Sequence, residues 1–489
     1  MVSFILCFIA LVLGYAIYGG FVEKVFGPDP KRRTPAVANA DGIDFVPLPA
    51  WRVCLIQFLN IAGTGPIFGA IMGAKFGPAS YLWIVLGSIF AGAVHDYFSG
   101  MLSVRNGGAN VPDIVGKYLG PVAKRVMLVV CVILLILVGT VFVDSPALIM
   151  DSLVEGNGGT LMIWVAVIFI YYVIATLLPI DKIIGRIYPF FAFAMLFMAV
   201  ALMVCLIMRW PSIPELFHGP IHPGKAAGLN SQDIFPCLFI TIACGAVSGF
   251  HATQTPLMAR CIKNEKLGRP VFYGSMIAEG IVALIWAAVS SYFFFDGGAA
   301  ECGSTISAQA PEVVTSVASE WLGPLGGVLA IIGVVICPLT SGDTAFRGAR
   351  LIIADFLHLN QRKKFNRLAI AVPIFAATAL LLWFNAENKD GFNKIWRYFG
   401  LCNQTLAAIM LWTITVFLSK KRRRFTYFLT LIPACFVTSI CVTNLFVDKI
   451  TLGIDTRYSP YIGVASFLIP ATLFFWGKLR RWPVLRRNQ

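Results

Sequence analysis

Long apolar runs alternate with short polar connections along the whole chain. The first run covers residues 4–20, and twelve more follow near 52–74, 79–102, 118–147, 160–178, 187–209, 234–259, 271–295, 325–357, 368–385, 393–418, 425–447 and 459–477. About 20 predominantly apolar residues are enough for an α-helix to cross the hydrocarbon core of a bilayer. The pattern therefore predicts an all-α integral membrane protein with about 13 transmembrane helices. Residues 301–324, ahead of the long run at 325–357, are expected to form a mixed outer loop.

The first apolar run is followed, not preceded, by basic residues. Lys24, Lys31, Arg32 and Arg33 all come after it. A cleaved signal peptide carries its positive charge first, so this run predicts an uncleaved anchor with its N-terminus outside. Residues 27–50, with five prolines, are expected to form a polar connection on the inner side.

Basic residues gather in every second connection. With the N-terminus outside, the segments that face the cytoplasm are 21–50, 103–125, 179–188, 260–270, 345–367, 419–425 and 478–489. They hold 30 of the 39 Lys and Arg residues, whereas the outer connections 148–159 and 296–324 hold none. This alternation follows the positive-inside rule and places the C-terminus in the cytoplasm. The net charge of +15 thus has a topological explanation, and we expect no nucleic-acid partner.

Composition supports the membrane class. The chain is 58% hydrophobic and 13% charged, whereas soluble domains are about 45–50% apolar and about 25% charged. The twelve cysteines include no CxxC pair, which excludes a disulfide scaffold and gives no zinc-ligand spacing. No P-loop, HExxH, GxSxG or dinucleotide fingerprint occurs in the sequence. We therefore expect no enzyme, no cofactor and no ATP-driven transport.

The apolar run at 239–259 is interrupted near its middle. Gly245, Ser248 and Gly249 loosen the helix, and Pro256 removes a backbone donor. A broken helix is tolerated at membrane depth only where protein or water satisfies the freed backbone groups. The segment is therefore expected to be part of a functional site.

An earlier run, 58–69, has the same character. Gly63 and Gly65 interrupt it, and Pro66 suits the first turn of a new half-helix. Two interrupted segments in corresponding positions of two halves point to the binding site of a transporter, although two unrelated kinked helices are the alternative. The positive end of a half-helix dipole favours an anion. The residues expected to bind substrate are Asn60, Gly63, Thr64, Gly65, Pro66, Gly245, Ser248, Gly249, His251, Thr253, Gln254, Asn403 and Gln404.

The number of runs suggests an internal repeat. One leading helix and two trailing helices flank ten others, which divide into two groups of five that each open with an interrupted helix. An odd number of spans per group inverts the second group, as in the five-plus-five inverted repeat of the LeuT type with broken first and sixth core helices. The predicted divisions are 1–50 (leading helix and connection), 51–210 (first repeat), 211–420 (second repeat) and 421–489 (two trailing helices and a basic tail).

Ionisable residues at membrane depth are costly and usually functional. Asp343 lies among hydroxyl residues that suit a small cation, although it can instead pair with Arg347 one turn later. Glu279 is a candidate proton carrier, and His251 titrates near neutral pH. The residues expected to couple an ion or proton are Thr340, Ser341, Asp343, Thr344 and Glu279.

Other polar residues have simpler explanations. His95 and Asp96 come late in their run, so we expect an interfacial ion pair with Arg105 or part of an inner gate, and favour the former. Asp144 lies towards the outer end of its run and is expected to reach water. The amides of Asn403 and Gln404 either line the cavity or form hydrogen bonds between helices.

Several short runs in combination resemble the carbon starvation protein A family. They are Gly63–Ile67, His95–Phe98, Gly185–Pro189, Phe250–Gln254, Met258–Arg260, Gly268–Gly274 and Cys402–Thr405. The similarity covers nearly the whole chain, with fewer trailing segments than the long enterobacterial proteins have. It implies a bacterial inner-membrane transporter of the amino acid–polyamine–organocation type. Related proteins are associated with peptide uptake and with proton-coupled pyruvate uptake during carbon limitation.

Two functions from different classes follow from these observations. The first is a secondary symporter that imports a small carboxylate such as pyruvate, or a short peptide, together with a proton or a sodium ion. The second is a membrane sensor that retains a transporter fold. No extra soluble domain is evident to carry a signal, which favours the symporter.

Overall fold

The protein is a bundle of membrane-length helices. The computed structural model describes residues 1–42, 45–154, 159–177, 180–359, 364–388, 391–421 and 425–486, with the backbone alone at 177, 180–190, 364 and 479–486. Ten helices in these ranges are long and apolar enough to cross a membrane, or eleven when the bent pair α4–α5 counts as one span. The all-α membrane class is therefore confirmed, and the count of thirteen stays a prediction.

In chain order, the structure contains α-helices (α) and shorter 3₁₀- or π-helical segments (η). They are α1 (Val2–Leu13), η1 (Gly14–Tyr18), α2 (Gly19–Phe26), α3 (Pro35–Ala38), α4 (Ala50–Ile61), α5 (Gly65–Ala74), α6 (Ala79–Gly87), η2 (Ser88–Gly92), α7 (Ala93–Arg105), α8 (Val111–Leu119), α9 (Pro121–Leu153), α10 (Leu161–Leu177), α11 (Ile180–Arg209), α12 (Pro223–Ala226), η3 (Ile234–Leu238), α13 (Phe239–Thr241), α14 (Gly249–Ala259), η4 (Glu265–Leu267), η5 (Arg269–Gly274), α15 (Ser275–Phe295), α16 (Gly298–Glu301), α17 (Ala310–Phe356), α18 (Lys364–Glu387), α19 (Gly391–Ser419), α20 (Phe428–Val447), η6 (Thr456–Tyr458) and α21 (Ser459–Arg486).

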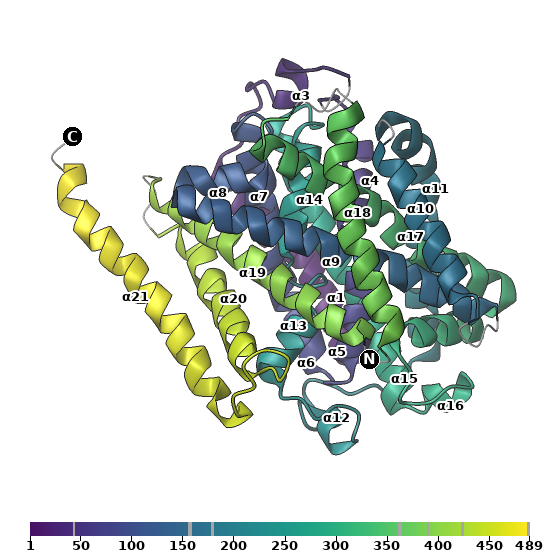
Figure 1. Cartoon of the computed structure of the whole chain (residues 1–489). Coiled ribbons are helices and arrows are strands. Elements are labelled where there is room, and N and C mark those ends of the chain that lie inside the picture. The colour runs from purple at the N-terminus through teal and green to yellow at the C-terminus, as the bar shows by residue number, and fades with distance from the viewer. Residues whose placement is uncertain are drawn as a thin grey trace.

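The helices separate the two kinds of connection to opposite ends of the bundle. Helix α3, in a connection predicted to be cytoplasmic, lies at the top of Figure 1, whereas α12 and α16, in outer connections, lie at the bottom. The N-terminus lies towards the same lower end, where its amine contacts the carboxylate of Glu215. The arrangement agrees with the alternation of basic residues along the chain.

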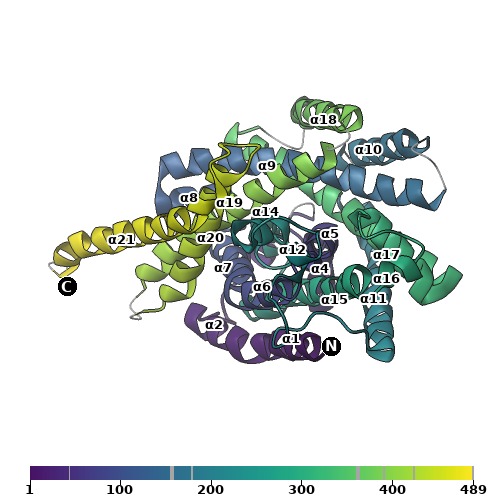
Figure 2. The same cartoon turned by 90° about the horizontal axis from the view of Figure 1, so that it is seen from below.

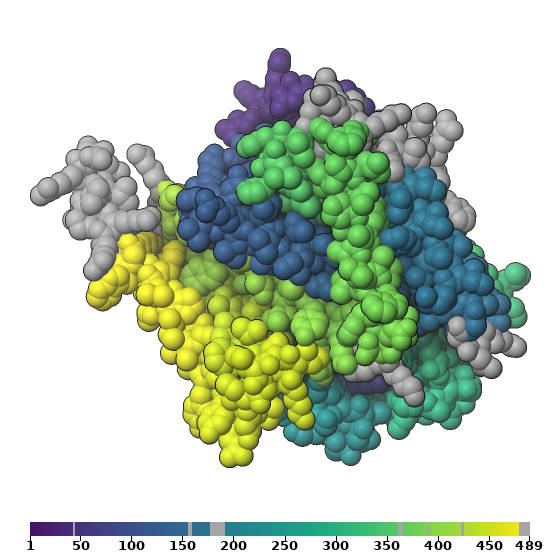
Figure 3. All heavy atoms as spheres, in the orientation of Figure 1, coloured from purple at the N-terminus to yellow at the C-terminus, as the bar shows by residue number. Residues whose placement is uncertain are grey.

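The interrupted helices occupy the centre of the bundle. Viewed along its length, α4, α5 and α14 are surrounded by α1, α9, α15, α17 and α19 (Figure 2). In the space-filling view, α18 and the trailing helix α21 lie on the visible surface (Figure 3). Helix α21 leans away from the bundle. Only 6% of the most apolar stretch within Thr456–Lys478 is buried, as expected of a helix that faces lipid.

The long helix α17 begins earlier than the sequence suggested. We expected 301–324 to be a loop, but α17 starts at Ala310 and bends at Gly323, whose φ of +66° is a left-handed conformation. The first part of the helix is amphipathic, with an apolar face that includes Val313, Val317 and Trp321 buried against the bundle. Packing of this face explains why the segment is helical.

Candidate functional site

The first interruption lies between α4 and α5. Helix α4 ends at Ile61, residues 62–64 turn the chain, and α5 leaves at 49° to α4. Pro66 occupies the first turn of α5, where a missing N–H leaves no unpaired donor. The N–H groups of Ile67 and Phe68 donate to the carbonyl oxygen of Thr64 at 3.1 and 2.8 Å, and this end of α5 is the positive end of its helix dipole. The buried Thr64 lies beside them, and its hydroxyl donates a 3.4 Å hydrogen bond to Ser145 Oγ.

The second interruption separates α13 from α14 across residues 242–248. Two buried amides of α19, Asn403 and Gln404, bind the chain there. The bonds are Phe250 N–H (2.7 Å) and Ser248 Oγ (3.2 Å) to Asn403 Oδ1, and Gln404 Nε2 to the carbonyl oxygens of Phe239 (3.1 Å) and Val247 (3.2 Å). Of the two roles considered for these amides, the structure shows the hydrogen bonds between helices. They satisfy backbone groups that the break frees.

The two interruptions contact each other. A Cβ atom added at Gly65 would lie 2.5 Å from both Cβ and Sγ of Cys244, so a side chain at position 65 would collide with the second break. A Cβ atom at Gly245 would lie 3.7 Å from Cα of Pro66. The absence of a side chain at Gly65 therefore permits the close approach of the two segments.

Polar atoms of four amide side chains beside the breaks are buried without hydrogen-bond partners among the described residues. They are both polar atoms of Gln57 and of Asn60, and Oε1 of Gln254 and of Gln404, whereas Nε2 of Gln254 donates a 2.9 Å hydrogen bond to Thr253 Oγ1. Gln57 and Asn60 lie one turn apart on the same face of α4, and α14, which carries Gln254, packs against α4. Buried polar groups normally pair with protein, water or a ligand. This group of amides therefore suits a polar ligand.

Four ionisable side chains from three helices form a second feature, the histidine cluster. It consists of His95 and Asp96 of α7, His251 of α14 and Glu279 of α15, and all four are fully buried. Asp96 lies between the two imidazoles, with Oδ1 2.8 Å from His95 Nδ1 and Oδ2 2.8 Å from His251 Nδ1. On its other side, His251 Nε2 lies 3.1 Å from Glu279 Oε2, although these two atoms are not aligned as a hydrogen bond.

The favoured expectation for Asp96, an ion pair with Arg105 at the membrane interface, was wrong, and a role in an inner gate stays a prediction. Asp96 pairs with His251 inside the bundle, and Arg105 pairs with the buried Glu265 at 3.0 Å. Arg105 follows Asp96 by nine residues on one helix, about 13 Å along its axis at 1.5 Å per residue. The sequence reasoning missed Glu265 because it approaches from η4, which is remote in the chain.

Asp343 lies in a different environment. Its Oδ1 is 3.5 Å from Nη2 of Arg347, and both side chains are buried. The neighbouring Thr340 and Ser341 donate hydrogen bonds of 3.4 and 2.9 Å to the carbonyl oxygen of Leu59. Leu59 lies in the last turn of α4, where carbonyls have no partner within the helix. The hydroxyls thus attach α17 to the first interruption.

Asp144 does not reach water as expected. Its side chain is 5% exposed and accepts a hydrogen bond from Asn385 of α18. Helix α18 covers this part of α9, which the sequence alone did not indicate.

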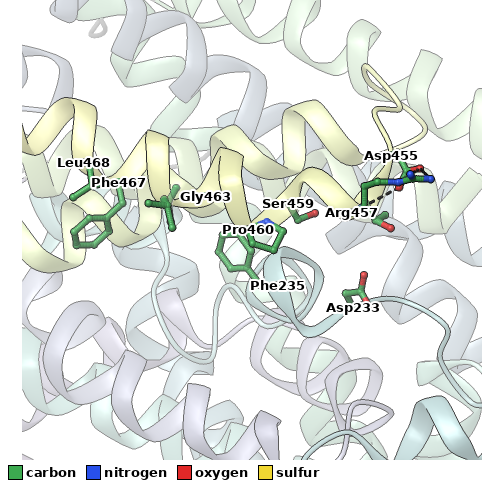
Figure 4. Close-up of a pocket in the computed structure, with 12 residues that line it drawn as sticks. Asp233, Phe235, Asp455, Arg457, Ser459, Pro460, Gly463, Phe467 and Leu468 are labelled. Atoms are coloured by element: carbon green, nitrogen blue, oxygen red, sulfur yellow. Dashed lines mark hydrogen bonds and ion pairs between the residues drawn. The ribbon is translucent and has the colours of Figure 1, made fainter.

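One cavity lies at the periphery of the bundle. It has a volume of about 810 Å³ and lies between α21 and η3, lined by Phe235, Pro460 and Phe467 among others (Figure 4). Its charged residues include Arg457 and Asp455, which form an exposed 2.8 Å ion pair. Neither interruption contributes to it, so we do not assign the substrate there. Among the described residues, no group of three His, Cys, Asp or Glu side chains is placed to hold a metal ion.

The chain resembles named transport proteins over most of its length. It is 26% identical to the Escherichia coli protein named peptide transporter CstA, covering 95% of this chain and 82% of that one. It is 25% identical to the Escherichia coli pyruvate/proton symporter BtsT, covering 88% and 79%. An uncharacterized membrane protein of Haemophilus influenzae is 46% identical over 60% of this chain and 91% of its own.

Solved structures show the same fold class at low sequence identity. The manganese transporter of Eremococcus coleocola superposes with a TM-score of 0.56 at 12% identity, covering 90% of this chain and 98% of the other. A sodium-coupled sialic acid symporter superposes with a TM-score of 0.52 at 12% identity, covering 96% of both chains. These neighbours are transporters of the LeuT fold.

Family membership follows from the match along the chain itself. The profile described as carbon starvation protein CstA matches residues 1–163, 149–324 and 312–444. Together these ranges extend over most of the sequence and include both interruptions and the histidine cluster. The chain is a multi-pass membrane protein of the carbon starvation protein CstA family.

Proposed function

We propose that the protein is a secondary symporter that imports a small carboxylate such as pyruvate, or a short peptide, across the bacterial inner membrane. In this proposal the N-terminus lies outside and the C-terminus lies in the cytoplasm. The helix order accommodates two inverted repeats of five spans, 51–210 opening with α4–α5 and 211–420 opening with α13–α14. The leading helix and the two trailing helices, α20 and α21, lie outside the repeats.

One observation carries the proposal: the two interrupted helices meet at the centre of the bundle, beside buried amide atoms that have no partner among the described residues. The positive end of the α5 dipole and the amide atoms of Gln57, Asn60 and Gln254 that lack partners among the described residues favour a polar ligand. Ser248, Gly249 and Thr253 lie on the facing segment, at the start of α14.

The charge of the site favours a small anion. No Lys or Arg occurs in 58–69 or 239–259, so a carboxylate would depend on helix dipoles and hydrogen bonds. An anion without a salt bridge is bound more readily when a cation enters with it. Peptides and pyruvate are the substrates in the names of the relatives, and both are included in the proposal.

Two places suit the coupled cation. The oxygen atoms of Thr340, Ser341, Asp343 and Thr344 beside the Leu59 carbonyl suit sodium, a hard cation. The histidine cluster, which includes Glu279, suits a proton instead.

Uptake into proteoliposomes tests the proposal. Labelled pyruvate and, separately, a labelled dipeptide should accumulate in vesicles that contain the protein when an inward proton or sodium gradient is imposed. A sensor would bind its ligand without accumulation. Failure of both substrates to accumulate under either gradient would contradict the symporter.

A matched pair of variants tests the position of the site. Gly65→Ala places a methyl group 2.5 Å from Cys244, so we expect at least about tenfold weaker uptake. Cys244→Gly in the same chain removes the colliding atoms and should restore much of the activity. Normal uptake by the single variant would place the substrate elsewhere.

A further inference from the structure

We propose that His251, Asp96 and Glu279 form the binding site of the transported proton, an inference that rests on the proposed symport. The relevant juxtaposition is one imidazole between two carboxylates, each group from a different helix, in a fully buried position. This site differs from the hydroxyl-rich segment of α17, and none of its carboxylates pairs with Lys or Arg among the described residues.

The geometry indicates that the transported proton is held by the pair His251 and Glu279. An ionised Asp96 can only accept hydrogen bonds, so the two Nδ1 atoms that lie 2.8 Å from its oxygens must both carry hydrogen. His251 Nε2 lies 3.1 Å from Glu279 Oε2, an ion-pair distance without hydrogen-bond alignment, so one proton on either group pairs the two side chains. Without that proton, an unprotonated imidazole nitrogen would lie 3.1 Å from an ionised carboxylate in a buried site.

Charge counting gives the same result. With one proton between His251 and Glu279, the three groups carry a net charge of minus one, whichever atom holds it. Loss of the proton leaves two carboxylates and a neutral imidazole, with a net charge of minus two in a buried site. Burial strongly disfavours such uncompensated charge. Protonation of this pair is therefore the step that changes the charge of the core.

Movement of the broken helix would change this protonation. His251 lies in the first turn of α14, directly after the interruption at 242–248, whereas Asp96 and Glu279 lie on the continuous helices α7 and α15. If α14 tilts when substrate binds at the interruption, His251 moves relative to both carboxylates. The proton can then leave Glu279 or His251 for the side of the membrane to which the substrate site opens. The three groups then return to a net charge of minus two.

The surroundings contain few competing charges. Among the described residues, the other titratable groups beside the site are His95 on α7, the thiol of Cys244 at the break and the thiol of Cys337 on α17. On the elements that pack against α14, the buried polar residues of α4 and α19 nearest the breaks are amides. Asp144 of α9 is bonded to Asn385, and Asp343 of α17 is paired with Arg347. On α8, Asp113 is paired with Lys124 at the surface.

The test separates proton coupling from substrate movement. Glu279→Gln keeps the size and a hydrogen-bonding amide but cannot titrate. In proteoliposomes with a one-unit inward pH gradient, electroneutral cotransport of one proton with pyruvate gives about tenfold accumulation at equilibrium, since a tenfold ratio corresponds to about 1.4 kcal/mol. We expect Glu279→Gln to lose this accumulation while it still exchanges internal for external labelled pyruvate. Asp144→Asn, which alters another buried membrane carboxylate, should retain both.

The outcomes distinguish the two proposals. Wild-type vesicles that neither exchange nor accumulate pyruvate or a labelled dipeptide would contradict the proposed symport. Wild-type accumulation together with full pH-driven accumulation by Glu279→Gln would overturn the proton site alone. If Glu279→Gln does not yield folded protein, Asp96→Asn replaces it, with the same two outcomes.

Discussion

The histidine cluster and the pair Asp343–Arg347 are both buried charges of the bundle, but their partners differ. Asp343 faces a guanidinium that stays charged at any physiological pH, whereas Asp96 and Glu279 face an imidazole that can lose its proton. The first arrangement has one stable charge state and the second has at least two. Burial of a carboxylate therefore does not by itself indicate proton transport; the partner decides.

The largest expected effect concerns stability at the α17 pair. Asp343→Asn leaves Arg347 without its carboxylate, and loss of one partner of a buried ion pair costs about 3–5 kcal/mol. Thermal unfolding in detergent, followed by tryptophan fluorescence, should show a large decrease in melting temperature. The double variant Asp343→Asn with Arg347→Met should recover much of it. A change of under about 1 kcal/mol in the single variant would show that the pair does not stabilise the fold.

At the histidine cluster we expect a small loss of stability and a large loss of proton-driven transport. Asp96→Asn removes a charge that His251 can compensate by losing its own proton, so the melting temperature should change less than in Asp343→Asn. Gradient-driven accumulation of pyruvate should fall about tenfold at a one-unit pH gradient, which corresponds to about 1.4 kcal/mol. Accumulation at the wild-type level would make Asp96 a structural residue like Asp343.

A smaller effect on transport is expected where α19 supports the second interruption. Asn403→Ala removes the acceptor of the Phe250 N–H, and an unpaired buried donor costs about 1–3 kcal/mol. This bond orients the first turn of α14. We therefore expect the substrate concentration for half-maximal uptake to rise and the maximal uptake rate to fall together. Thr405→Ala is the matched control, because the Thr405 hydroxyl bonds to the carbonyl oxygen of Leu401 and to Cys441 rather than to the break. Equal kinetics in the two variants would contradict a role for Asn403 in holding the break.

The smallest effect should come from the hydroxyls of α17. Ser341→Ala removes one hydrogen bond to Leu59, worth about 0.5–1.5 kcal/mol. If the proton is the coupled ion, replacing sodium by choline at fixed pH should alter uptake in neither the wild type nor this variant. A sodium requirement that Ser341→Ala weakens would assign coupling to α17 and remove it from the histidine cluster.

The sequence was sufficient to locate the helix interruptions. Gly63, Gly65 and Pro66 act through local backbone preferences, which are readable from neighbouring residues. Residues 62–64 and 242–248 separate helices in the structure, as those preferences suggested. The alternation of basic residues is equally local, and it predicted which connections share an end of the bundle.

The histidine cluster was beyond such reasoning. Asp96 is separated from His251 by 155 residues, and Glu279 belongs to a third helix, so no spacing in the sequence brings them together. The position of Asp96 near the end of its apolar run suggested the membrane interface instead. Contacts between remote helices depend on packing, and packing also decided that Asn403 and Gln404 bond to the second break.

The most direct test of the account measures proton and substrate together. Proteoliposomes with a pH-sensitive dye inside, and with no initial pH or sodium gradient, receive external labelled pyruvate or a labelled dipeptide. The account predicts that uptake acidifies the interior in proportion to the substrate taken up, in the absence of sodium, and that Glu279→Gln abolishes the acidification. Uptake that requires sodium and leaves the internal pH unchanged would contradict it.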